Sequence, residues 1–169
     1  LNVKDAPSDT FPDLPREPPS PAEAAEVNPQ ALLAHLRHEL RTPINAILGY
    51  SEMLLEDTAE GTGIYRDLNR IRTAGSELLS KINDLLSPSQ LGSGDLDPYL
   101  KRHAADLCSA LHTSTNTIIG YSELLIDDGV FPGKEGVTLD LVKIRTAAER
   151  LCVLSENIAS HGESFHLFD

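Results

Sequence analysis

Hydrophobic residues recur every three or four positions along four stretches of the chain, the spacing that places them on one face of an α-helix. In the first stretch, the stripe consists of Leu33, Leu36, Leu40, Ile44, Ile47, Ser51 and Leu54. In the second stretch, it consists of Leu68, Ile71, Leu78, Ile82 and Leu85. A polar turn with two glycines, residues 57–63, separates the two stretches. The pattern predicts a helical hairpin.

A second hairpin is expected further along the chain. Asn28–Pro29 and Asp97–Pro98 both place a capping residue before a proline, which favours the start of a helix. The later helices are expected at about residues 98–126 and 138–159. Residues 1–27 hold six of the eleven prolines and show no apolar period. The predicted segments are a disordered linker (1–27), a first hairpin (28–88), a connector (89–97), a second hairpin (98–160) and a tail (161–169).

The two hairpins are copies of one another. A shift of 71 residues aligns residues 36–56 with residues 107–127, with identity at ten of the twenty-one positions, including "GYSE". A shift of 73 aligns "IRTA" at residue 71 with "IRTA" at residue 144. One hairpin buries little apolar surface, whereas two can share a core. The sequence therefore predicts an all-α fold in which two helical hairpins form an antiparallel four-helix bundle.

The composition narrows the function classes. The formal net charge is −12 at pH 7 and the 14 basic residues are scattered, which argues against nucleic-acid binding. The acidic surface is either simply solvated or a docking surface for a basic partner. No apolar run approaches the roughly 18 residues of a membrane span, so we expect a cytoplasmic chain without membrane contact. Cys108 and Cys152 are expected as reduced thiols.

The stretch "HELRTP", residues 38–43, contains the candidate chemistry. His38 lies off the apolar stripe, so its imidazole is expected to be exposed and nucleophilic near neutral pH. Glu39 can hold the proton on the other ring nitrogen. The Thr42 hydroxyl lies one turn along the same face and can orient a water molecule. Pro43 removes a helical hydrogen bond and is expected to bend the helix. Glu39 and Thr42 as ordinary surface residues remain alternatives.

"HELRTP" closely resembles the H-box of the dimerisation and histidine-phosphotransfer domain of sensor histidine kinases, in which hairpins from two subunits form a four-helix bundle. The resemblance covers about residues 30–159 and implies a tandem pseudo-dimer within a monomeric chain. It implies that His38 accepts a phosphoryl group, that Glu39 is the general base and that Thr42 serves dephosphorylation. It also implies that a response-regulator receiver domain docks below the histidine. The docking residues expected from the resemblance are Ile47, Leu48, Tyr50 and Ser51, although for Ile47 a core role is favoured over a docking role.

The second hairpin has lost this chemistry. The 71-residue shift aligns His38 with Ser109, Glu39 with Ala110 and Pro43 with Ser114, whereas Thr42 keeps a threonine. His112 aligns with Arg41 and not with His38, so we expect no phosphorylation there. What persists is largely what packing requires, and the second hairpin is interpreted as a scaffold.

The leading hypothesis is a histidine phosphotransfer module of a two-component phosphorelay. No Walker-type or G-x-G-x-x-G motif occurs, so no cofactor and no ATP-binding domain are expected in this chain. Phosphoryl groups would come from a receiver aspartate, a separate histidine kinase or a separate ATP-binding domain. His35 and His38 as a metal pair are disfavoured because no third ligand has suitable spacing. The alternatives are a non-catalytic bundle that binds a receiver or kinase or controls a fused effector, and a bundle that dimerises with another chain.

Overall fold

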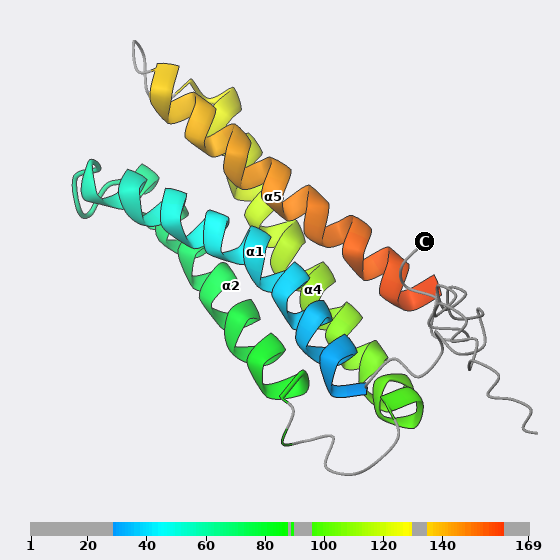
Figure 1. The fold of residues 1–169 in the computed structure, drawn as a ribbon. Coiled ribbons are helices and arrows are strands. Elements are labelled where there is room, and N and C mark those ends of the chain that lie inside the picture. Colours follow the sequence, from blue (N-terminus) through cyan, green and yellow to red (C-terminus); the bar gives the residue numbers. More distant parts are fainter. Residues whose placement is uncertain (1–28, 88, 90–95, 130–134, 161–169) are drawn as a thin grey trace, which may run out of the picture.

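The computed structural model describes residues 29–87, 89, 96–129 and 135–160. These residues form four helices and no strand: α1 (Pro29–Glu56), α2 (Gly63–Leu85), α4 (Leu96–Asp127) and α5 (Glu135–Ser160). The helices α1 and α2 form one antiparallel hairpin, and α4 and α5 form the other (Figure 1). The predicted all-α bundle of two hairpins is therefore confirmed. The expected linker, tail, Asn28 cap and most of the connector lie outside the described residues.

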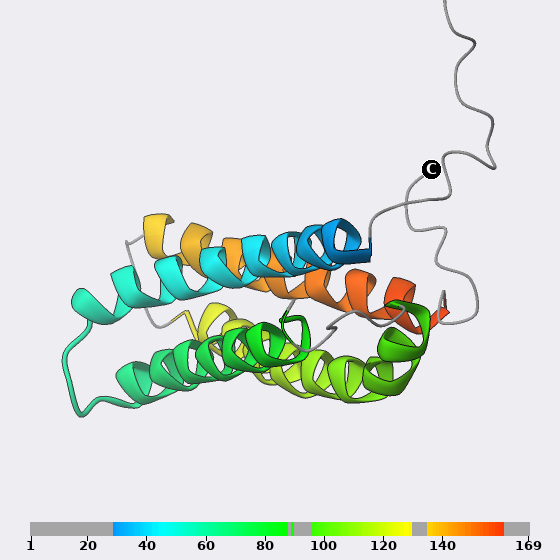
Figure 2. The same ribbon diagram turned by 60° about the horizontal axis from the view of Figure 1, so that its bottom comes forward.

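The two hairpins pack against one another side by side (Figure 2). Helix α1 contacts α2 of its own hairpin and α5 of the other, while α4 contacts α5 and α2. The two first helices, α1 and α4, therefore lie diagonally across the bundle. Each hairpin covers the apolar face that the other could not bury alone.

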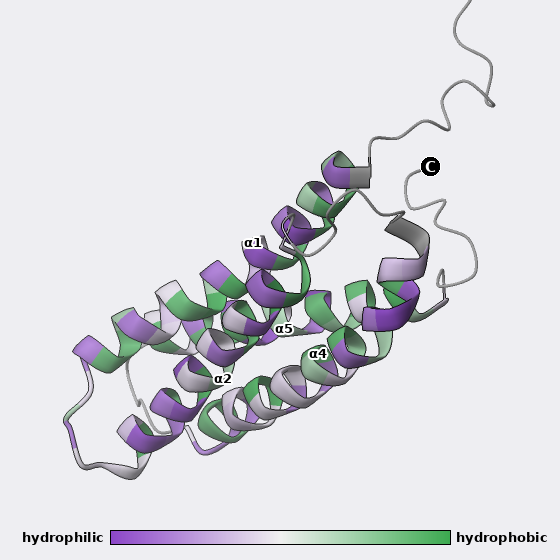
Figure 3. Cartoon of the chain, turned by 90° about the horizontal axis from the view of Figure 1, so that it is seen from below, coloured by the Kyte–Doolittle hydropathy of each residue, from purple (hydrophilic) through white to green (hydrophobic). Residues whose placement is uncertain are grey.

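The predicted stripe of the first helix forms the core. All seven of its residues, including Ser51, are buried, and the hydrophobic faces of the helices point inward (Figure 3). The 71-residue repeat pairs core positions in α1 and α4 that are buried in both copies: Leu36 with Leu107, Leu40 with Leu111, Ile47 with Ile118, Ser51 with Ser122 and Leu54 with Leu125. The repeat therefore corresponds to equivalent packing.

The helix ends refine the sequence-based boundaries. Helix α2 begins after Thr62, whose hydroxyl accepts a hydrogen bond from the Tyr65 amide at 3.1 Å. Gly61 precedes this cap with a φ of 81°, a conformation that glycine adopts without steric cost. Helix α4 begins at Leu96, so Asp97 lies inside the helix, and α5 begins at residue 135, three residues before the expected start.

A three-residue contact joins α2 to α4. Arg70 pairs with Asp67 on its own helix at 3.1 Å. The same guanidinium donates a hydrogen bond to the Tyr121 hydroxyl at 2.8 Å and lies 5.0 Å from the centre of the Tyr121 ring. Arg70 thus holds Tyr121 of the other hairpin by a hydrogen bond and by cation–π attraction.

The equivalent contact joins α5 to α1. Lys143 pairs with Asp140 at 2.9 Å, and its ammonium lies 4.7 Å from the centre of the Tyr50 ring. Under the 73-residue shift, Arg70 and Asp67 align with Lys143 and Asp140. Under the 71-residue shift, Tyr50 aligns with Tyr121. The hydrogen bond to Asp140 is the main reason why the pKa of Lys143 is raised. The two inter-hairpin interfaces are therefore chemically related.

Candidate functional site

His38 lies on the outer face of α1. Its side chain is 77% exposed, whereas Leu40 and Ile44 on the opposite face are buried. The exposure follows from the helical period. His38 precedes Leu40 by two residues and therefore lies nearly on the opposite side of the helix from Leu40. The imidazole is thus accessible to a macromolecular partner.

Glu39 lies between His38 and the second hairpin. Its Oε1 atom is 3.9 Å from His38 Nδ1, beyond hydrogen-bond distance. Its Oε2 atom is 3.4 Å from Nη2 of Arg150 on α5. Because the carboxylate faces Nδ1, Nε2 is the ring nitrogen left to attack an incoming group.

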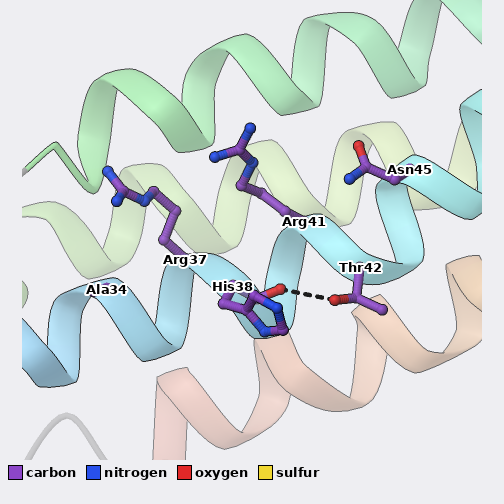
Figure 4. A pocket seen from close by; sticks show the side chains of 6 residues that line it. All are labelled: Ala34, Arg37, His38, Arg41, Thr42 and Asn45. Carbon is purple, nitrogen blue, oxygen red and sulfur yellow. Dashed lines mark hydrogen bonds between the residues drawn. The ribbon is translucent and has the colours of Figure 1, made fainter.

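Two arginines flank the histidine on α1. Arg37, His38, Arg41 and Thr42 line a shallow pocket of about 280 Å³, together with Ala34 and Asn45. Arg37 and Arg41 extend to one side of α1, and His38 and Thr42 lie on the other (Figure 4). Within the described part of the chain, neither guanidinium has a hydrogen-bond or ion-pair partner. Both positive charges are available to an anionic ligand.

Thr42 and Pro43 follow one turn after the histidine. The Thr42 hydroxyl donates a hydrogen bond to the His38 carbonyl oxygen at 3.0 Å, and its lone pairs can still accept one from water. Pro43 is buried, and α1 continues through it. The predicted bend at Pro43 and the water-orienting role of Thr42 stay predictions. Both residues line a groove of about 360 Å³ between α1 and α5.

The structure corrects half of the expected docking residues. Ile47 and Ser51 are fully buried, and Ser51 donates its hydroxyl hydrogen bond to the Leu48 carbonyl oxygen at 3.0 Å. A serine on the apolar stripe can stay there because the preceding helical turn satisfies its hydroxyl. Neither residue can contact a partner without opening the bundle. Both positions belong to the stripe, so the docking role expected for Ser51 is wrong and Ile47 has the core role that was favoured for it.

The other two docking residues lie on different sides of α1. Leu48 is half-buried and faces α2, where a Cβ atom on Gly75 would lie 3.2 Å from its Cδ2 atom. Tyr50 is half-buried and lines the α1–α5 groove below Lys143. The four predicted residues therefore do not form a single surface patch.

The second hairpin presents different groups at the equivalent positions. Ser109 is exposed, whereas Ala110, the counterpart of Glu39, is buried. His112 is exposed, and its Nδ1 atom lies 3.1 Å from the Asn116 side-chain nitrogen. This neighbour, an amide on the same helix, differs from the carboxylate that faces Nδ1 of His38.

The described residues also bear on two other classes of site, a metal centre and a membrane-spanning helix. Among the residues that the structure describes, no group of three or more His, Cys, Asp or Glu side chains is placed to hold a metal ion. Within the same residues, no helix is long and apolar enough to cross a membrane.

Comparison with known proteins bears directly on this geometry. Residues 30–94, which contain α1 and α2, match the model of the His Kinase A (phospho-acceptor) domain. Residues 30–94 form a HisKA domain. This identification confirms the resemblance drawn from "HELRTP" for the first hairpin, and the match ends before α4 begins.

Relatives of the HisKA domain occur in much longer kinases. The chain is 40% identical over 79 residues to the cell-division control histidine kinases PdhS of Brucella anthropi, Brucella ovis and Brucella suis. Each alignment covers 45% of this chain and 8% of the Brucella protein. No solved structure matches the chain. The family match therefore supports a phospho-acceptor or dimerisation role in two-component signalling for the first hairpin.

Sequence reasoning missed three basic residues near His38. Arg41 lies within "HELRTP" and Arg37 directly precedes it, but neither side chain was given a role. Arg150 lies 111 residues from Glu39, so local spacing could not associate the two. The repeat held a signal for Arg150. The 73-residue shift aligns it with Glu77, so the two copies carry opposite charges at this position.

Proposed function

We propose that this chain is a histidine phosphotransfer module of a two-component phosphorelay, in which His38 exchanges a phosphoryl group with the aspartate of a receiver domain. The observation that carries the proposal is the exposed His38 imidazole in a HisKA domain, with Glu39 on its Nδ1 side. Arg37 and Arg41 add positive charge beside the ring. This combination supplies a nucleophile, a proton acceptor and groups that attract phosphate.

The transfer requires few protein groups. The lone pair of His38 Nε2 attacks the phosphorus of an aspartyl phosphate, a nitrogen–phosphorus bond forms, and the bond from phosphorus to the aspartate oxygen breaks. The aspartate leaves as a carboxylate, and the proton stays on Nδ1. Glu39 stabilises that proton as the ring becomes positive, which requires its Oε1 atom to approach within hydrogen-bond distance. The reverse reaction returns the phosphoryl group to a receiver.

Further residues of the first hairpin support this reaction. Arg37 and Arg41 offset the negative charge of the transferred group, and guanidinium groups suit phosphate oxygens well. Thr42 orients a water molecule for hydrolysis of phosphohistidine. Pro43 bends α1 next to the site and so controls access to His38.

We also propose that the second hairpin takes the place of a partner subunit. The supporting observation is that α5 contacts α1 as α2 contacts α4, through the related Lys143–Tyr50 and Arg70–Tyr121 pairs. The chain then works as a monomeric pseudo-dimer with one acceptor. Its partners are a receiver domain, which contacts exposed parts of α1 near Leu48 and Tyr50, and a separate histidine kinase or ATP-binding domain.

Phosphoryl transfer from receivers tests the proposal. Receiver domains phosphorylated with acetyl phosphate are mixed with the chain, and label on the chain is followed over time. We expect transfer to the wild type and to His112→Ala, and none to His38→Ala. The matched control is His112→Ala, which removes another exposed histidine of the bundle. Absence of transfer to the wild type from a broad receiver panel, or transfer that survives His38→Ala, would show that the proposal is wrong.

A non-catalytic interaction module is the second candidate. The observation in its favour is the groove between α1 and α5, which offers Ala46, Tyr50 and Ala147 to a partner without involving the imidazole. Such a bundle would bind a receiver or kinase, or control a fused effector. Partner binding and signalling output that are unchanged in His38→Ala would favour it over phosphotransfer.

A further inference from the structure

An ion pair connects the two hairpins at the candidate site. Arg150 on α5 donates a hydrogen bond from Nη2 to Oε2 of Glu39 on α1, at 3.4 Å. The other carboxylate oxygen, Oε1, is the atom that faces His38 Nδ1. One carboxylate thus lies between the histidine of the first hairpin, at 3.9 Å, and an arginine of the second, to which it is hydrogen-bonded. The interaction crosses the interface between the hairpins.

Stability does not explain this pair. The Arg150 side chain is 59% exposed, and exposed ion pairs contribute little to folding because water screens them. The pair also does not reproduce a contact of the repeat. Its counterpart in the other half of the bundle is Ala110 with Glu77, which has no carboxylate at the position of Glu39 and no cation at the position of Arg150. The cation at position 150 therefore occurs only beside the hairpin that has the acceptor histidine.

Glu39 needs a constraint if it is to serve His38. Neighbouring residues on a helix do not face each other, so an unrestrained glutamate next to a histidine spends much of its time in solvent. The carboxylate is held on the α5 side of α1, where Thr42 and Arg150 line one groove. With Oε2 fixed by Arg150, Oε1 is left on the His38 side.

We propose that Arg150 is a positioning residue that orients Glu39 toward His38, so that the second hairpin contributes to the phosphotransfer site. This inference rests on the proposed function of His38. Arg150 contacts neither the imidazole nor the phosphoryl group in this role. It acts through Glu39, which selects the tautomer with the proton on Nδ1 and leaves the Nε2 lone pair free. The second hairpin is then part of the site and not only a scaffold.

Two measurements on the full chain test this role. The first is the rate of His38 phosphorylation by phosphoramidate, a small donor that releases ammonia and needs no receiver, followed by NMR at the His38 ring. The second is the tautomer of unphosphorylated His38, read from nitrogen–proton correlation spectra. Arg150→Ala should slow phosphorylation by roughly tenfold, part of the 10² or more that a positioned base provides. It should also move the His38 proton from Nδ1 toward Nε2.

Three comparison variants make the result specific. Arg150→Lys keeps a cation that can reach Glu39 and should stay within about threefold of the wild type. In a Glu39→Gln background, Arg150→Ala should cause no further slowing, because both changes act through one carboxylate. Arg72→Ala removes an exposed arginine of α2 that contacts Asn69 on its own helix, and it should change neither readout.

The outcomes separate this inference from the function on which it rests. If the wild-type His38 is never phosphorylated, the proposed function fails, while the tautomer spectra still report on Arg150. If phosphorylation proceeds and Arg150→Ala matches the wild type in rate and tautomer, the positioning role is wrong. A faster Arg150→Ala variant would also overturn it, because Arg150 would then hold Glu39 away from the ring.

Discussion

The two hairpins share a core but differ at the surface. Along α1 and α4, five of the six aligned stripe positions from Leu36 to Leu54 hold the same residue, and all are buried. The exception is Ile44, which is replaced by the buried Thr115. The acceptor histidine is replaced by the exposed Ser109, and its base is replaced by the buried Ala110.

Core residues and reactive residues therefore lie on separate faces of the same helix. The buried stripe of each hairpin is constrained by the shared core. Loss of that stripe in either hairpin would unfold the bundle. The outer face has no such constraint, and one copy can lose its reactive groups without harm to the fold. The second hairpin has lost the acceptor but has gained Arg150, which reaches back to Glu39.

The largest difference in stability is expected at the one stripe position where the copies differ. Ile44→Ala should lower the free energy of unfolding by about 2–5 kcal/mol, because it leaves a cavity in the core. Thr115→Val should lower it by about 1 kcal/mol or less, because the Thr115 hydroxyl donates to the Leu111 carbonyl, which already accepts within the helix. Urea unfolding followed by circular dichroism measures both. Equal losses would contradict the view that the two copies pack the same core with different residues.

Rebuilding the site on the second hairpin tests whether the missing surface groups are what makes it inactive. In a His38→Ala background, Ser109→His with Ala110→Glu supplies an acceptor and a carboxylate, but the carboxylate starts from a buried position and Glu77 remains as a like charge at the position equivalent to Arg150; circular dichroism checks that the bundle still folds. Adding Glu77→Arg should raise phosphoramidate labelling at position 109 by roughly tenfold, as a positioned base would. Peptide mapping by mass spectrometry measures the label. No gain from Glu77→Arg would show that the cation is not a missing element.

The smallest effect is expected at the two inter-hairpin tyrosines. Tyr121→Phe removes the hydroxyl that accepts from Arg70 at 2.8 Å and should lower the free energy of unfolding by about 0.5–1 kcal/mol. Tyr50→Phe should have no measurable effect, because the aromatic ring below Lys143 remains. Both variants are compared with the wild type in parallel urea titrations. A larger loss in Tyr50→Phe would contradict this ranking.

The fold could be predicted because helical periods and an internal repeat are local signals. The stripe from Leu33 to Leu54 identified the buried face of α1, and by exclusion it placed His38 on the exposed face. Helix starts were less certain because prolines tolerate several positions in a first turn. This explains why Asp97 lies inside α4 and not before it.

The site was predicted only in part, for physical reasons. Motif residues close in sequence, such as His38 and Glu39, could be placed on one helix without a structure. Ser51 was assigned to a partner surface by the family resemblance although it lies on the apolar stripe; its hydroxyl is satisfied by the Leu48 carbonyl, and it stays in the core. Arg150 depends on how α5 packs against α1, and no local pattern encodes that contact.

The central claim is that one chain holds one active hairpin and one inactive copy. Intact mass spectrometry of the wild type after reaction with a phosphorylated receiver, combined with peptide mapping and light scattering, tests it most directly. The account predicts one phosphoryl group per chain, located on His38, in a protein that scatters as a monomer. Two phosphoryl groups per chain, or label on His112, would contradict it.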